Sequence, residues 1–283
     1  TYGNVLMEQG VRNALAITEL LGHPEVKVYR GLDHSSTTDS FQVLEISSFI
    51  HGQNGIGEAV IADSTRDAED TPAVDFIIDA AKTYGKDLVY VPTGPLTNLD
   101  AAIARAPEIV DEIGRVVLMG GALTVPGNVN AWTEANISQD PDAANRVFRS
   151  GIPATMVGLD VTLQTLLTYK ETQRWRDLGT PAGAFLADMT DFYIKAYETT
   201  APHLGGCGLH DPLAVGVAVD PSLVTVIEHN MKVDVDGETR GRTIGDEVRL
   251  NDPVKNVKVA VGVDVERFLS EFMSRIGSVA GRA

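Results

Sequence analysis

Glu134 and Asn136 stand two positions apart in GNVNAWTEANISQDPDAANRVF (127–148), a polar approach to a helix. Side chains two residues apart share a face of an extended segment. A carboxylate beside carboxamides suits a polyhydroxylated ligand, because each sugar hydroxyl both donates and accepts hydrogen bonds. The competing interpretation is loop polarity together with helix capping. Asp140-Pro141 has that explanation, with the aspartate as N-cap and the proline at the first helical position, whereas Glu134 and Asn136 show no such local reason.

A second candidate is CGLHDPLAVGVAV (207–219), where His210 precedes Asp211 and Pro212. Aspartate is a hard oxygen ligand suited to Ca²⁺ or Mg²⁺, and histidine can donate a proton near neutral pH. Asp211-Pro212 also has the form of a helix start, so capping is the competing interpretation.

Three further stretches contain residues that could take part in chemistry. The glycines of HGQNGIG (51–57) give the loop that contains His51 the flexibility of a mobile flap, and the absence of a lysine makes it a poor phosphate cradle. Tyr193 and Tyr197 are four apart on one face of an expected helix, where they either line an aromatic pocket or simply pack. Cys207 has no CxxC partner, and neither HExxH nor GxSxG occurs.

Composition narrows the class of protein. The 283 residues carry a net charge of −16, which argues against a nucleic-acid partner, since phosphate binding draws on clustered Lys and Arg. A hydrophobic fraction of 43% supports a substantial core. The single cysteine excludes an intrachain disulfide and fits a reducing cytoplasm. No apolar run approaches the roughly 20 residues of a membrane span, so we expect no membrane partner.

The elements that must position these residues alternate along the chain. Residues 5–22 have helical spacing, residues 26–31 are short and β-rich, and residues 31–71 read mainly as a long loop. From residue 72, apolar strands alternate with helices, which predicts an open, mostly parallel, Rossmann-like α/β sheet with helices on both faces. We expect helices at 73–85, 96–107 and 140–150, strands at 86–94, 115–121 and 152–160, further helices between 163 and 219, a β-rich part at 222–262 and a closing helix at 265–277.

No repeat or linker interrupts this pattern, which predicts one domain over 1–283. In such sheets, ligands bind beyond the carboxyl ends of the strands. Those ends fall at residues 93–98, 119–130 and 158–162. The polar approach around Glu134 therefore belongs to the loop after a central strand, where a site is expected.

Taken together, these stretches resemble the inosine–uridine nucleoside hydrolase family. The matching pieces run in family order over essentially the whole chain: YGNV, HGQNGIG, VPTGPLTNLDAA, RVVLMGGA, GNVNAWTEANISQDPDAA, MVGLDVT and HDPLAV. The resemblance implies hydrolysis of the N-glycosidic bond of ribonucleosides, one Ca²⁺ at the bottom of the pocket, and a homodimer or homotetramer. Ca²⁺ would orient and acidify the attacking water, and carboxylates would stabilise the ribosyl cation.

The resemblance also implies roles for individual residues. His210 would protonate the departing base, and His51 would lie on the flap that closes over the ligand. The metal would be held by Asp211 and by the backbone carbonyl of Thr97. The positions that it implies for contacts with the ribose or the base are Asn4, Met119, Asn128, Glu134, Asn136, Tyr193, Tyr197 and Asp211.

Two features depart from the family pattern. Members begin with a β-strand that ends in an aspartate cluster of the form DxDxxxDD, which supplies the general base and most metal carboxylates, and this sequence, which opens TYGNV, does not contain it. We therefore expect either a fragment of a longer chain or a truncated, inactive homologue that only binds ribose or a nucleoside. Ala135 stands where many members carry an aromatic residue, which leaves purine or pyrimidine preference open.

Overall fold

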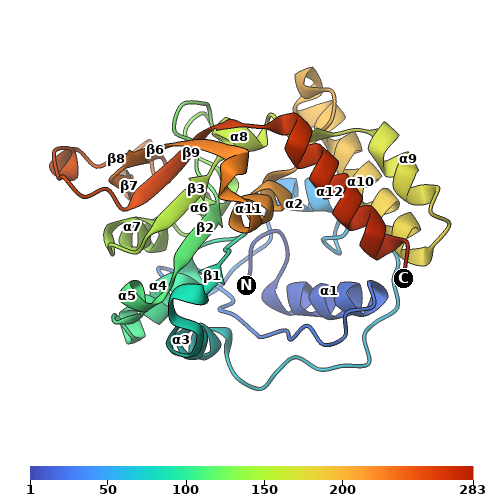
Figure 1. The fold of residues 1–283 in the computed structure, drawn as a ribbon, viewed down its shortest axis with the longest axis horizontal. Helices are drawn as coiled ribbons and strands as arrows, with labels where there is room; N and C mark the ends of the chain where they lie inside the picture. The colour runs from blue at the N-terminus through green and yellow to red at the C-terminus, as the bar shows by residue number, and fades with distance from the viewer. Residues whose placement is uncertain (283) are drawn as a thin grey trace.

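A five-stranded sheet forms the centre of the molecule in the computed structural model, which describes residues 1–282 (Figure 1). Its strands, in spatial order, are β1 (Val89–Tyr90), β2 (Arg115–Met119), β3 (Ala154–Val157), β9 (Val257–Val263) and β6 (Val224–His229). The first four are parallel, and β6 runs antiparallel to β9. Two small antiparallel ladders join β4 (Leu166–Leu167) to β5 (Cys207–Gly208) and β7 (Met231–Val233) to β8 (Thr243–Gly245). The predicted mostly parallel sheet and β-rich C-terminal part are confirmed.

Helices cover both faces of this sheet. In β2, Val116 and Leu118 belong to one buried cluster, whereas Val117 and Met119 belong to the other. A strand buried on both faces reads as a continuous apolar run, which is why the sequence shows no polar alternation here. One face is covered by α3 (Ala73–Tyr84), α4 (Thr97–Arg105), α5 (Ile109–Glu112) and α7 (Pro141–Arg149). The other is covered by α8 (Leu159–Thr162), α9 (Tyr169–Arg176), α10 (Pro181–Thr200), α11 (His210–Val219) and α12 (Val265–Ala280). None of the helices within residues 1–282 is long and apolar enough to cross a membrane.

The N-terminal part differs from its expectation in two places. The stretch 31–71 is not only loop, because it contains the helix α2 (Glu45–His51), whose last residue is the flap histidine. Residues 26–31 do not form a regular strand, because Tyr29 finds a single bridge partner, Glu69. A β-rich sequence needs a paired neighbour to become a strand, and one bridge does not supply it. The predicted helix at 5–22 is present as α1 (Met7–Leu20).

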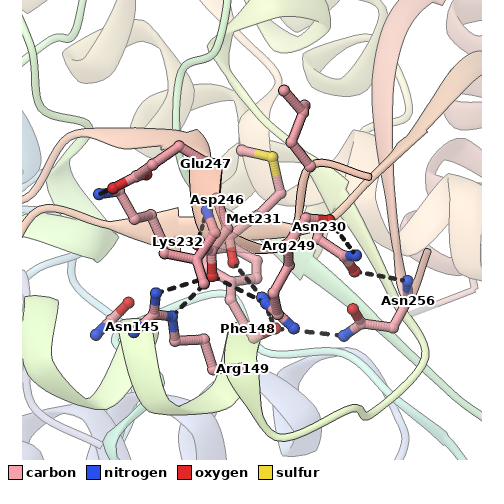
Figure 2. A network of polar contacts seen from close by, with 12 residues as sticks. Asn145, Phe148, Arg149, Asn230, Met231, Lys232, Asp246, Glu247, Arg249 and Asn256 are labelled. Carbon is pink, nitrogen blue, oxygen red and sulfur yellow. Dashed lines mark hydrogen bonds and ion pairs between the residues drawn. The ribbon is translucent and has the colours of Figure 1, made fainter. Parts of the chain in front are cut away.

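A polar network around the buried carboxylate of Asp246 ties the β7–β8 hairpin to α7 (Figure 2). Arg149 and Arg249 both pair with Asp246, whose side chain is fully buried. The same hairpin carries Thr243, whose hydroxyl accepts a hydrogen bond from the Ala122 N–H at 3.0 Å and donates one to the Ala122 carbonyl at 2.9 Å. The hairpin thereby fixes the backbone just beyond β2, where the polar approach to the candidate site begins.

Candidate active site

A pocket with a volume of about 330 Å³ lies at the carboxyl ends of β1 and β2. Its walls come from the flap around residues 50–57, the approach at 128–136, the middle of α10 and the start of α11. Nine of the predicted site residues line it, from segments far apart in the sequence: Asn4, His51, Met119, Asn128, Glu134, Asn136, Tyr193, His210 and Asp211. The location agrees with the rule that such sheets bind ligands beyond the strand ends.

Asp211 is the carboxylate in this pocket that no protein donor engages within residues 1–282. The interpretation of Asp211 as a helix cap is wrong: α11 begins at His210, after Leu209, and has no side-chain cap. Asp211 is exposed to solvent where it lines the pocket, and the surrounding protein atoms partly desolvate its carboxylate. This desolvation, together with the nearby charge of Glu134, raises the pKa of Asp211 to about 7. A recessed carboxylate without a protein partner is available to a ligand.

Glu134 has a structural role that the sequence did not reveal. It is the N-cap of α6 (Ala135–Gln139), with Oε1 accepting from the Asn136 N–H at 2.9 Å and Oε2 from the Ile137 N–H at 3.1 Å. Oε2 also accepts from the Gly121 N–H at 2.9 Å, which joins the approach to the end of β2. Burial raises the pKa of Glu134, and the three N–H donors oppose that rise. The expectation that Glu134 lacked a local structural reason is wrong.

We expect Glu134→Gln to lower the free energy of unfolding by about 1–3 kcal/mol. The amide nitrogen that replaces one oxygen would face a backbone N–H, so a buried donor would lose its acceptor. Urea denaturation measures this loss. Glu238→Gln, at an exposed position in the β7–β8 turn, is the matched control and is expected to leave stability unchanged. Equal stability of the two variants would contradict the capping role.

Hydrogen bonds to neighbouring backbone groups position the side chains of Asn136 and Asn128 in the pocket. Asn136 Nδ2 donates to the Met119 carbonyl at 3.1 Å and lies 3.1 Å from Met119 Sδ. Asn128 Oδ1 accepts from the Ala135 N–H at 2.9 Å. Asn136 Oδ1 and Asn128 Nδ2 have no partner among the described residues, which leaves one acceptor and one donor for ligand hydroxyls.

His210 is connected to two tyrosines of α10. Its Nε2 lies 2.7 Å from Tyr197 OH, which lies 3.3 Å from Tyr193 OH. Tyr193 lines the pocket, whereas Tyr197 is buried behind it and does not. Burial, and then the neighbouring His51, lower the pKa of His210 to about 4, so the ring is neutral at pH 7. On its other side, Nδ1 lies 2.7 Å from Thr162 Oγ1.

His51 closes the same wall from the flap. Its ring stacks on Tyr193, with centroids 5.3 Å apart and an interplanar angle of 23°. Burial lowers the pKa of His51 to about 4. Gly57, further along the flap, has φ +65°, and a Cβ at this position would lie 2.9 Å from the Met189 carbonyl oxygen. A side chain at residue 57 would therefore prevent the close approach of the flap to α10.

Thr97 does not lie where the resemblance placed it. It is the first residue of α4, is 2% exposed, and does not line the pocket. Its hydroxyl donates to Asp140 at 2.8 Å and lies 3.0 Å from Tyr2 OH. The metal role of its carbonyl stays a prediction, and the threonine of this stretch that lines the pocket is Thr93, three residues beyond the end of β1. Asp140 caps α7 as predicted and also binds Ser36.

Several residues that line the pocket were not predicted from the sequence. Thr93 was within reach of the strand-end rule, because it is the nearer to β1 of the two threonines in this stretch. The others come from α2, α10 and the short strand β5, where a residue that lines the pocket cannot be told from a core residue by the sequence pattern. They are Ile50, Met189, Thr190 and Gly208.

The pocket does not supply the ligands that the implied Ca²⁺ needs. Across residues 1–282, no group of three or more Asp, Glu, His or Cys side chains could hold a metal ion. Ca²⁺ takes six to eight oxygen ligands. Asp211 offers a free carboxylate, but Glu134 already accepts three N–H bonds and Asn128 Oδ1 accepts one. These residues therefore do not by themselves complete a Ca²⁺ site.

Known proteins resemble this chain in sequence and in fold. A solved structure described as a purine-preferring ribonucleoside hydrolase from Gardnerella vaginalis is 77% identical, with a TM-score of 0.99, and is matched over 100% of this chain and 89% of that one. A plant nucleoside hydrolase structure is 33% identical, with a TM-score of 0.90, over 98% and 89% of the two chains. The pyrimidine-specific ribonucleoside hydrolase RihB of Escherichia coli is 35% identical over 268 residues, which are 94% of this chain and 83% of that protein.

The sequence model described as inosine-uridine preferring nucleoside hydrolase matches residues 1–270. That range contains every strand of the central sheet and every residue that lines the pocket. The chain belongs to the inosine-uridine preferring nucleoside hydrolase family.

Proposed function

We propose that this chain hydrolyses the N-glycosidic bond of ribonucleosides and releases the free base and ribose. The observation that carries the proposal is one pocket that combines the unengaged carboxylate of Asp211 with the hydrogen-bonded series His210, Tyr197 and Tyr193. Family membership supports it, since the relatives are named hydrolases or nucleosidases of nucleosides.

Each part of the pocket suits one demand of this reaction. As the bond between the anomeric carbon and the base nitrogen breaks, its electron pair leaves with the base, and positive charge develops on the ribose. The carboxylate of Asp211 stabilises that charge electrostatically. Water then adds hydroxide to the anomeric carbon, and the base gains a proton. The Tyr193 hydroxyl, backed by Tyr197 and His210, donates a hydrogen bond to the departing base.

We propose that purine ribonucleosides are the preferred substrates. The relative that is 77% identical is described as purine-preferring, although the more distant RihB is described as pyrimidine-specific. The small side chain of Ala135 lines the pocket and leaves this wall open to a larger base. We expect kcat/KM for inosine to exceed that for uridine by about tenfold or more, since a pocket contact discriminates by 1–3 kcal/mol. Equal values for the two substrates would remove this part of the proposal.

The test of the hydrolase proposal is release of free ribose from inosine by the purified chain, measured with added Ca²⁺ and with a chelator. Ribose release that stops in the chelator supports both the reaction and the metal dependence that the resemblance implies. Release that continues in the chelator supports the reaction alone. Binding of inosine without any release, measured by calorimetry, would instead support a non-catalytic nucleoside-binding protein.

A further inference from the structure

Both ring nitrogens of His210 lie against hydroxyl groups. Thr162 Oγ1 is 2.7 Å from Nδ1, and Tyr197 OH is 2.7 Å from Nε2. A neutral imidazole has one donor nitrogen and one acceptor nitrogen, so the ring can bind these hydroxyls in two ways that run in opposite directions. Only one direction leaves Tyr193 free to donate into the pocket.

Thr162 selects one of the two directions, because its hydroxyl hydrogen has a single available acceptor among the described residues, Nδ1 of His210. Thr162 is the last residue of α8, and it is fully buried, at 0% exposure. Within residues 1–282, Nδ1 of His210 is the one hydrogen-bond partner of its hydroxyl. If Nδ1 carried the proton and donated, the Thr162 hydroxyl hydrogen would be buried without an acceptor, which costs about 1–3 kcal/mol.

We propose that Thr162 is a positioning residue that holds His210 as the tautomer with its proton on Nε2. The Thr162 hydroxyl donates to Nδ1, and Nε2–H donates to the Tyr197 oxygen. The Tyr197 hydrogen then points to the Tyr193 oxygen, its other partner at 3.3 Å. Tyr193 OH has no further acceptor among the described residues and lines the pocket, so its hydrogen points at the ligand. Every donor in the series is therefore aimed at the base.

The catalytic effect of Thr162 rests on the proposed function, because a hydrogen-bond donor directed at the base affects the rate only if the base is a leaving group. Thr162→Val keeps the shape of the side chain and removes the hydroxyl, while Thr162→Ser keeps the hydroxyl. We expect Thr162→Val to lower kcat for inosine by about tenfold or more with little change in KM, since a positioned proton donor contributes about 10²–10⁴ in rate. The Thr162→Ser variant is expected to retain most of kcat.

A second substrate separates positioning from a structural role. Nitrophenyl riboside has a leaving group that departs without a proton, so its hydrolysis by Thr162→Val is expected to equal that by the wild type. An equal loss of kcat on both substrates, or no loss on inosine, would overturn the proposal. Melting temperatures of the variants are compared so that a folding defect is not read as a catalytic one.

The tautomer itself is measured without turnover. Nitrogen NMR of the wild-type chain distinguishes a protonated from an unprotonated ring nitrogen, and His210→Gln assigns the signal among the six histidines. We expect the proton on Nε2, and a proton on Nδ1 would overturn the proposal even if Thr162→Val did not fold. If the wild type releases no ribose from either substrate, the proposed function fails, while the tautomer measurement still tests the role of Thr162.

Discussion

Asp211→Asn is expected to lower kcat/KM for inosine by about 10³-fold, the scale found when one preorganised electrostatic group is removed from an active site. The asparagine has nearly the same shape but no negative charge to oppose the positive charge on the ribose. The substitution should therefore lower kcat without lowering the stability of the fold. Steady-state kinetics with inosine measures it.

Stability is the second measurement on this variant. No protein donor within residues 1–282 engages the Asp211 carboxylate, so the substitution breaks no hydrogen bond, and we expect a melting temperature at least equal to that of the wild type. Asp252→Asn, on an exposed loop, is the control that changes the same charge away from the pocket. A variant that keeps more than a tenth of the wild-type kcat/KM would remove Asp211 from the catalytic machinery.

Asp246→Ala is expected to lower the free energy of unfolding by about 3 kcal/mol, near the low end for breaking a buried ion pair by removing one partner. Asp246 is fully buried, while Arg149 and Arg249 are 44% and 24% exposed at their side chains, so both can recover part of their hydration. Asp246 also caps the short turn that follows β8, by accepting from the Val248 N–H at 3.2 Å. Figure 2 shows the Asp246 carboxylate between Arg149 of α7 and Arg249, which follows the hairpin.

The pH dependence of the same contact has a definite sign. Burial by itself would raise the pKa of Asp246, but the two guanidinium groups and the Val248 N–H hold it below its ordinary value of 3.8. Its stabilising contribution is therefore complete above that value and is lost as pH falls through the lower, folded-state pKa. Urea denaturation at neutral pH measures the loss in Asp246→Ala, with Asp236→Ala in the exposed hairpin turn as the control. A loss below about 1 kcal/mol would contradict the role of this contact.

The two variants test opposite uses of a carboxylate. Asp246 is buried with two cations and holds the hairpin that fixes Ala122 beyond β2. Asp211 is recessed without a partner, and its raised pKa records what that arrangement costs the charged form. Places where a chain breaks a local rule of polar satisfaction are expected at functional sites. We therefore expect Asp246→Ala to affect stability first and Asp211→Asn to affect activity first.

The class of fold and the edge of the sheet where the pocket lies could be predicted from the amino-acid sequence. Continuous apolar strands between helices predicted a parallel sheet covered on both faces, because a strand buried on both sides carries no polar alternation. The strand-end rule then placed residues 119–130 beside a site, and the pocket is found there. Helix α7 and its cap at Asp140 followed from a local signal, a capping residue and a proline within one turn.

What each polar residue does was decided by tertiary structure. Glu134 and Asp211 both appeared as carboxylates near a helix start, but Glu134 caps and Asp211 does not, since capping depends on which N–H groups the backbone turns toward the side chain. Thr97 and Thr93 differ by four positions, yet the start of α4 buries one and leaves the other in the pocket. Thr162 and His210 are 48 residues apart, and they are in contact because the fold brings the end of α8 and the start of α11 together. Sequence spacing reports neighbours along the chain, whereas partners across the fold are set by packing.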